Sequence, residues 1–296
     1  MSKVAVATDS SSGITQAQAS ELGLYVLPMP FYIDDEVYYE EVNLTQEDFY
    51  RKLEKEAKIS TSMPAVGEVM DLWNRLLEDH DEVVYIPMSR GLSGSCQTAR
   101  MLAEDSEEFA GKVFVADNQR ISVTQRQSAC EAVAMARAGM SGQQICEVLE
   151  QTGRDSSIYI TVETLKYLKR GGRITPAAAA LGTLLRIKPV LQIQGEKLDA
   201  FAKCRTMGQG RTLMIEAIRK DLDERFHLQE EPWKCQIDGA YTCSAQEAEE
   251  WKQQIEAAFP GHTVQMDPLP LVIACHIGPG SMAVTITKKV ELSENN

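Results

Sequence analysis

Short apolar runs alternate with helical stretches through the first half of the chain, and this alternation is the strongest constraint on its fold. Apolar runs at residues 4–7, 83–86 and 113–116 are each followed by a loop and a stretch with helical character. Strands that alternate with helices form parallel sheets, because each helix carries the chain back across one face of the sheet. We therefore expect an α/β domain with a mainly parallel sheet and flanking helices over residues 1–155.

A second unit begins near residue 156 and orders its elements differently. Two strand candidates, residues 189–193 and 197–201, flank a turn at Gly195. Further strands are expected at residues 158–162, 236–240, near 264, at 271–274 and at 283–286. We expect these strands to form a mixed sheet in a C-terminal α/β domain over residues 156–296.

The loop at residues 89–95, Ser-Arg-Gly-Leu-Ser-Gly-Ser, lies between an expected strand and an expected helix. Its small residues place hydroxyls and backbone N–H groups at a helix N-terminus, an arrangement that binds anions. The donors are neutral apart from Arg90, which suits a carboxylate or a phosphate held by hydrogen bonds. A helix cap explains the serines equally well, so this loop alone leaves both interpretations open.

Three other segments place polar groups at the ends of regular elements. Residues 61–64 (Thr-Ser-Met-Pro) precede a helix, residues 171–173 (Gly-Gly-Arg) follow one, and residues 276–280 (His-Ile-Gly-Pro-Gly) follow an apolar run. A helix start or a helix stop accounts for each segment by itself. Together they supply hydroxyls, one guanidinium and one imidazole, which is a set of groups that can hold a carboxylate.

The composition argues against several classes of protein. A formal net charge of −13 argues against general nucleic-acid binding. The seven cysteines include no C-x-x-C and the four histidines lie far apart, which argues against a zinc site and a disulfide framework and favours the cytoplasm. No apolar run approaches the ~18 residues that span a bilayer, although transient contact with a membrane surface remains compatible.

The charge is unevenly distributed along the chain. Residues 151–220 contain thirteen Lys and Arg against five Asp and Glu, a net charge of +8. An ordinary solvated face is one explanation. We favour a docking face for an acidic partner or a phosphate-bearing ligand.

Six motifs occur in order along nearly the whole chain and together resemble the DegV family, whose members include the fatty-acid-binding subunits of bacterial fatty acid kinase. The motifs are Thr8-Asp9-Ser10-Ser11, residues 61–64, residues 89–95, residues 167–174 (Tyr-Leu-Lys-Arg-Gly-Gly-Arg-Ile), residues 188–191 (Lys-Pro-Val-Leu) and residues 276–280. Each motif alone is weak, whereas the combination is specific.

The resemblance implies a two-domain α/β protein with one long-chain fatty acid between the domains. By the family's pattern, Thr61 and Ser93 contact the carboxylate. The residues near the head group are then Ser62, Gly94, Arg173 and His276. The sequence departs from the family at Arg90, where a small residue is common, and at Ser95-Cys96, where Thr-Tyr is common; both departures concern the pocket mouth.

The resemblance further implies a lipid carrier that acts in phospholipid metabolism without catalytic residues, metal or cofactor of its own. The expected ligand is a fatty acid such as palmitate or oleate, which the protein presents to a separate ATP-dependent kinase subunit. No phosphate-binding loop of the G-x-x-x-x-G-K-[ST] type occurs in the chain. Within the basic region, we expect Lys166, Lys169 and Arg170 to dock that partner.

Other functions remain open at this point. Ser93, Asp117 and His276 follow the order of a serine hydrolase triad, although residues 91–95 are not G-x-S-x-G. A domain of the dihydroxyacetone kinase type would use a histidine to bind a small carbonyl compound, and a protein-interaction module would bind no small ligand. The apolar residues 177–185 suit either a tail pocket or plain core.

Overall fold

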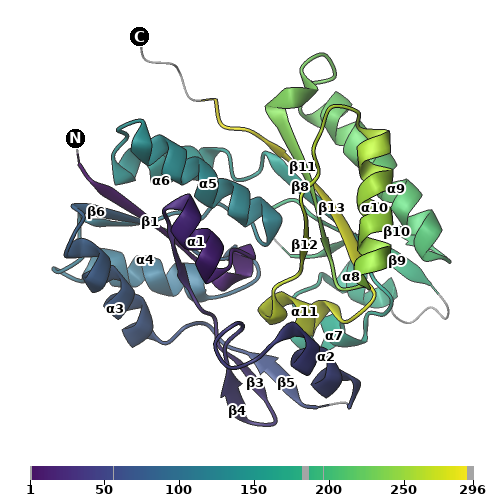
Figure 1. The fold of residues 1–296 in the computed structure, drawn as a ribbon, viewed down its shortest axis with the longest axis horizontal. Coiled ribbons are helices and arrows are strands. Elements are labelled where there is room, and N and C mark those ends of the chain that lie inside the picture. The colour runs from purple at the N-terminus through teal and green to yellow at the C-terminus, as the bar shows by residue number, and fades with distance from the viewer. Residues whose placement is uncertain (1, 56, 182–186, 196, 292–296) are drawn as a thin grey trace. The chain divides into compact units, whose positions relative to one another are not determined.

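The computed structural model describes residues 2–55, 57–181, 187–195 and 197–291, and Figure 1 shows its helices and strands. The chain divides into two compact units: the first comprises Met1–Arg154 and Val290–Asn296, and the second comprises Asp155–Lys289. The predicted domains, residues 1–155 and 156–296, differ from these units at the C-terminal end. There the chain returns to the first unit, where the Val290 backbone N–H donates to Glu131 Oε1 at 3.1 Å.

A four-stranded parallel sheet with the order β2-β1-β6-β7 forms the centre of the first unit. Its strands are β1 (Val4–Asp9), β2 (Tyr25–Leu27), β6 (Glu82–Ile86) and β7 (Val113–Val115). The helices that cover it are α1 (Gln16–Leu22), α3 (Val66–Leu77), α4 (Ser95–Asp105), α5 (Val123–Arg137) and α6 (Gly142–Gln151).

Helices cover both faces of this sheet (Figure 1). Val83 and Tyr85 of β6 pack with α3 and α4 on one face, whereas Val84 and Ile86 pack with α1, α5 and α6 on the other. Parallel strands buried on both faces have continuous apolar sequences, which explains the apolar runs of β1 and β6. The parallel sheet with flanking helices that the sequence predicts is therefore confirmed.

A small antiparallel sheet with the order β4-β3-β5 also belongs to the first unit. It contains β3 (Phe31–Ile33), β4 (Glu36–Tyr38) and β5 (Ile59–Thr61), with α2 (Gln46–Glu54) between β4 and β5. Strand β5 is absent from the sequence expectations, because three residues with only one large apolar side chain carry no strand pattern. Its pairing with β3 places Thr61 opposite Phe31.

The second unit contains a six-stranded mixed sheet with the order β10-β9-β8-β13-β11-β12, in which only β11 and β12 are parallel neighbours. The strands are β8 (Ser156–Thr161), β9 (Lys188–Ile193), β10 (Asp199–Cys204), β11 (Cys235–Tyr241), β12 (Met266–Pro268) and β13 (Met282–Lys288). The mixed sheet that the sequence predicts is confirmed.

Helices α9 (Met207–Lys220) and α10 (Ala245–Ala258) pack on one face of the mixed sheet, where Trp251 and Ile218 are fully buried. The other helices are α7 (Lys166–Gly171), α8 (Pro176–Leu181) and α11 (Leu271–Ile277), with short helical turns at Ser10–Ser12, Asp221–Arg225 and Pro232–Lys234.

The strand expected at residues 271–274 is wrong, because these residues belong to α11. A short apolar run fits a buried helix and a buried strand equally well, and periodicity alone does not separate them.

Capping boxes begin three helices, with Thr15 before α1, Ser141 before α6 and Ser244 before α10. In each, the hydroxyl accepts a hydrogen bond from the backbone N–H three residues later, and that residue's side chain bonds back to the cap. Among the described residues, no helix is both long and apolar enough to cross a membrane.

Candidate functional site

Thr61 and Ser62 lie at the exit of β5, in a loop of residues 61–65 that we call the Thr61 loop. Both residues are partly exposed. The Ser62 backbone N–H donates to Pro30 O at 3.4 Å, which continues the pairing of β5 with β3 beyond the strand end. Helix α3 then begins at Val66, with the Glu68 carboxylate accepting from the Ala65 backbone N–H at 3.0 Å.

Ser93 and Gly94 lie in residues 88–95, the Ser93 loop, which connects β6 to α4. The Ser93 backbone N–H donates to Ser89 O at 3.1 Å, and Ser93 Oγ accepts from the Ser95 backbone N–H at 3.2 Å. A hydroxyl that accepts one hydrogen bond still has a proton to donate. The Ser93 loop therefore presents a neutral donor beside the N-terminus of α4, where the helix dipole favours an anion.

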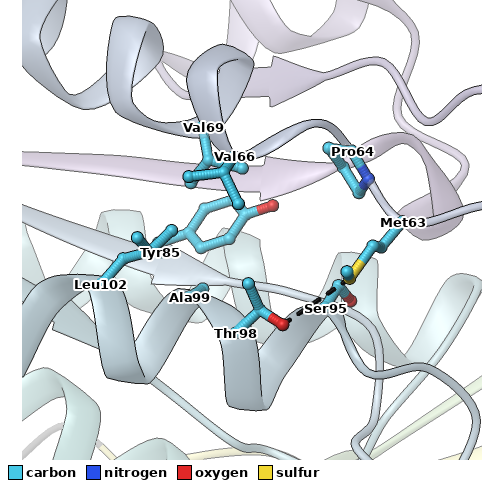
Figure 2. Close-up of a pocket in the computed structure, with 9 residues that line it drawn as sticks. All are labelled: Met63, Pro64, Val66, Val69, Tyr85, Ser95, Thr98, Ala99 and Leu102. Atoms are coloured by element: carbon cyan, nitrogen blue, oxygen red, sulfur yellow. Dashed lines mark hydrogen bonds between the residues drawn. The ribbon is translucent and has the colours of Figure 1, made fainter.

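The two loops meet at one small pocket of the first unit (Figure 2). Met63 and Pro64 of the Thr61 loop and Ser95 of the Ser93 loop line it, and Thr98 Oγ1 of α4 donates to Met63 Sδ at 3.6 Å. The rest of the wall is Val66, Val69, Tyr85, Ala99 and Leu102. Thr61 and Ser93 are thus each two residues from the wall of a largely apolar pocket.

A buried polar network holds the start of the Ser93 loop. Asp9 Oδ2 accepts from the Met88 backbone N–H at 2.9 Å, and Asp9 Oδ1 accepts from the Ser11 backbone N–H at 3.0 Å. Gln125 Nε2 donates to Asp9 Oδ1 at 3.2 Å and to Ile86 O at 3.1 Å. Burial raises the pKa of Asp9, and these hydrogen bonds act in the opposite direction.

Arg173 and His276 lie together in the second unit, where the end of α7 packs against α11. Arg173 Nη1 donates to Gly171 O. Gly171 lies so close to the His276 ring that a Cβ on Gly171 would collide with Nδ1. Glycine at this position therefore allows the two motifs to approach each other.

His276 is neutral at pH 7. Its burial, and secondly the nearby Arg173 guanidinium, lower the pKa of the imidazole to about 4. Arg173 therefore carries the positive charge of this pair, and the neutral His276 ring has one donor nitrogen and one acceptor nitrogen.

The three expected docking cations, Lys166, Lys169 and Arg170, are exposed on α7. Lys166 Nζ lies 5.8 Å from the centre of the Tyr167 ring. Tyr167 in turn packs against Gly278, where any Cβ would collide with the ring. Tyr167 of α7 thus packs against the loop that follows α11, beside the Lys166 ammonium.

The predicted site residues fall into two groups. The structure brings together the loops of Thr61, Ser62, Ser93 and Gly94 in the first unit, and Arg173 with His276 in the second. Of the apolar residues 177–185, Ala178 and Leu181 of α8 are buried, and residues 182–185 lie outside the described part of the chain.

Sequence reasoning missed Tyr85 and Gln125. Tyr85 lies inside the apolar run of β6, where it reads as ordinary core. Gln125 is fully buried on α5, and its partner Asp9 lies 116 residues earlier in the chain. The only signal was the polar Thr8-Asp9-Ser10-Ser11 motif, which had no assigned role.

Asp117, which the hydrolase alternative would need to orient a histidine, pairs with another residue of the first unit. Its carboxylate Oδ2 lies 3.0 Å from Arg90 Nε, and its side chain is buried while that of Arg90 is largely exposed. The same contact gives a structural role to Arg90, which the motif comparison had marked as a departure. No group of His, Cys, Asp and Glu side chains in the described ranges could hold a metal ion.

Comparison with known proteins identifies relatives along almost the whole chain. The model of the family described as "Uncharacterised protein, DegV family" matches residues 3–289. A DegV domain-containing protein of Listeria monocytogenes is 31% identical over 288 residues, which cover 96% of this chain and 98% of the relative.

Solved structures show the same architecture. A fatty-acid-binding DegV protein from Thermus thermophilus is 28% identical, with a TM-score of 0.86 over 97% of this chain and 99% of that chain. A fatty-acid-binding DegV protein from Bacillus subtilis is 26% identical, with a TM-score of 0.83 over 98% of this chain and 100% of that chain. Sequence and fold agree: the chain belongs to the DegV family.

Proposed function

We propose that this protein binds one long-chain fatty acid, such as palmitate or oleate, and that Thr61 and Ser93 hold its carboxylate. The observation that carries the proposal is the pocket of the first unit, where the Thr61 loop and the Ser93 loop meet beside an apolar wall (Figure 2). A small anionic head on an apolar tail matches these surroundings. Fatty acid binding by the solved DegV relatives from T. thermophilus, Streptococcus agalactiae and B. subtilis supports the proposal.

The tail and the head group of a fatty acid contribute differently to the free energy of binding. Each buried methylene contributes about 0.8 kcal/mol, so a long tail supplies most of the affinity before the cost of association. The head group then needs orientation, which neutral hydroxyls provide. The pocket has room for about 10 Å³, so binding a tail requires its wall to open. Met63 and Val66 are 42% and 40% exposed and form the exposed part of the wall.

The ligand itself is the first test. Denaturation of the purified protein, solvent extraction and mass spectrometry should yield close to one long-chain fatty acid per chain. A copurifying small carbonyl compound, or no ligand combined with no binding of added fatty acid, would contradict the proposal.

The head-group assignment is tested by removing the two hydroxyls. Thr61→Val and Ser93→Ala should each weaken fatty acid binding about tenfold, because a hydrogen bond to a charged group is lost while the tail contacts remain. Ser60→Ala removes a neighbouring exposed hydroxyl of β5 and should leave the dissociation constant unchanged. Equal effects of all three substitutions would contradict specific roles for Thr61 and Ser93.

We further propose that the protein presents the bound carboxylate to an ATP-dependent kinase subunit and docks it through Lys166, Lys169 and Arg170. Their exposure on α7 and the net positive charge of residues 151–220 support this assignment. Reversal of all three charges to Glu should slow kinase-dependent acyl phosphate formation without weakening fatty acid binding.

The matched control reverses three exposed cations of the first unit, Arg51, Lys55 and Lys112. Both triple variants change the net charge equally, so a general electrostatic effect would slow phosphorylation in both. A slower rate only for the α7 variant supports local docking, and an unchanged rate for that variant refutes it.

A further inference from the structure

The pocket of the first unit contains two buried hydroxyls that lack a hydrogen-bond partner among the described residues. They are Tyr85 Oη and Ser95 Oγ. Tyr85 is 1% exposed and Ser95 is 6% exposed, so bulk water does not replace the missing partners. Figure 2 shows both side chains in the wall of the pocket, on β6 and at the start of α4.

Unpartnered buried hydroxyls are unusual and destabilising, because each loses its bonds to water without replacement. Tyr159 of the second unit shows the ordinary arrangement: its buried hydroxyl donates to Asp221 Oδ2 at 2.8 Å. Two such exceptions in one pocket point to a hydrogen-bonding group that enters from outside the chain.

The size and lining of the pocket define that group. Its volume of about 10 Å³ is close to the minimum that holds one water-sized group. Pro64, Val69 and Leu102 make the remaining surface apolar. The closed pocket therefore suits a single oxygen, and an alkyl chain that carries this oxygen enters when the wall opens, as any tail must.

The charge around the pocket favours a neutral oxygen over a carboxylate. Asp9 lies near enough to Tyr85 to raise the pKa of the phenol, in addition to the larger effect of burial. A carboxylate in this pocket would find no cation in the lining to compensate its charge. The fatty acid head group therefore belongs with the Thr61 and Ser93 hydroxyls, outside this part of the pocket.

We infer that Tyr85 and Ser95 are specificity-determining residues that select a long-chain acid with a hydroxyl on its alkyl chain over the unsubstituted acid. The inference rests on the proposed function, since it concerns the tail of the same ligand. A ligand hydroxyl can donate to one of the two side chains and accept from the other, which satisfies both. An unsubstituted tail leaves both hydroxyls without partners.

The test compares octadecanoic acid with a set of hydroxyoctadecanoic acids that carry the hydroxyl at different carbons. Binding to the delipidated full-length protein is measured by competition with a fluorescent fatty acid. At least one hydroxy acid should bind about fivefold more tightly than octadecanoic acid, the effect of one net hydrogen bond. Tyr85→Phe and Ser95→Ala should each remove most of this preference, measured within each variant as the ratio of the dissociation constants of octadecanoic acid and the hydroxy acid.

Tyr159→Phe is the matched control, because it removes a buried hydroxyl from the second unit and should leave the preference unchanged. The inference is overturned if no hydroxy acid binds more tightly than octadecanoic acid, as expected when the two hydroxyls hold only a water molecule. It is also overturned if the Tyr85→Phe/Ser95→Ala double variant keeps the preference. Failure of the proposed function looks different, since none of the acids would then bind to the wild-type protein.

Discussion

The two units supply different chemistry. The first unit offers neutral hydroxyls, on Thr61 and Ser93, next to an apolar pocket. The second unit offers charge, with Arg173 beside a neutral His276 and three exposed cations on α7. A ligand with a long tail gains its affinity from apolar burial, and a docking partner is steered by charge. The contrast teaches that the apolar pocket and the exposed cations to which we assign fatty acid binding and partner docking belong to different compact units of one chain.

The units also build their sites by different means. The parallel sheet of the first unit brings the Ser93 loop and the Asp9 network together because the carboxyl ends of its strands lie at one edge. The second unit joins its motifs by close packing of α7 with α11, at Gly171 and Gly278. Glycine is consequently a steric requirement at these two positions of the second unit.

The largest expected effect is the loss of stability when alanine replaces Gly278, compared with the same substitution at Gly94. Gly278 has φ 80° and ψ 172°, a region that is almost restricted to glycine, and its Cβ would strike the Tyr167 ring. Gly278→Ala should lower the free energy of unfolding by about 3 kcal/mol. Gly94 has φ −74° and no described atom within 4 Å of an added Cβ, so Gly94→Ala should change it by less than about 0.5 kcal/mol.

Urea unfolding measures both changes. Equal destabilisation by the two substitutions would contradict a steric requirement for glycine at position 278 that is absent at position 94. Gly94→Ala also tests the position of the ligand. A loss of fatty acid binding at unchanged stability would mean that the carboxylate approaches the Gly94 backbone, as the predicted place of Gly94 near the head group implies.

The next effect concerns pH and His276. Because the folded pKa is about 4 and the ordinary value is 6.5, the unfolded chain binds the proton more readily between these values. Stability contributed by neutral His276 is therefore present above about pH 6.5 and is lost as the pH falls towards 4, by at most about 3 kcal/mol. His276→Gln should flatten the pH dependence of urea unfolding in this window, and an NMR titration midpoint near 6.5 would contradict the assignment.

Asp9 in the first unit acts in the opposite direction. Its folded pKa lies above the ordinary value of 3.8 because of burial, so the folded protein holds the proton more readily than the unfolded chain. The contribution of protonated Asp9 is therefore present at low pH and is lost as the pH rises above 3.8. The two buried groups thus give their units opposite responses to acid.

The smallest effect compares one ion pair from each unit. Arg90→Ala leaves the buried Asp117 carboxylate without its cation and should lower the free energy of unfolding by about 1 kcal/mol. The loss is no larger because water around the exposed Arg90 side chain already weakens the ion pair. Lys188→Ala leaves the Glu163 carboxylate, which is 41% exposed and therefore solvated, and should cost less than about 0.5 kcal/mol. Thermal unfolding of the two variants measures the difference, and a reversed order would contradict it.

Local patterns predicted much of the fold. The apolar runs of β1 and β6 and the capping boxes at Thr15 and Ser141 depend on near neighbours in the chain, so the sequence displays them directly. The helix at Leu271–Ile277 escaped prediction because burial on all sides removes the amphipathic pattern. Strand β5 escaped because its pairing with β3, and not its own composition, makes it a strand.

The sequence by itself determined the α/β class, the DegV motifs and the residues proposed to hold a carboxylate, because these depend on residue type and order. Only the tertiary structure decided that the Thr61 and Ser93 loops share a pocket, that Gln125 supports Asp9, and that the Tyr85 and Ser95 hydroxyls find no partner in the described part of the chain. The physical reason is that hydrogen-bond satisfaction and close packing depend on residues far apart in the chain, which come together only when the sheet and its helices assemble.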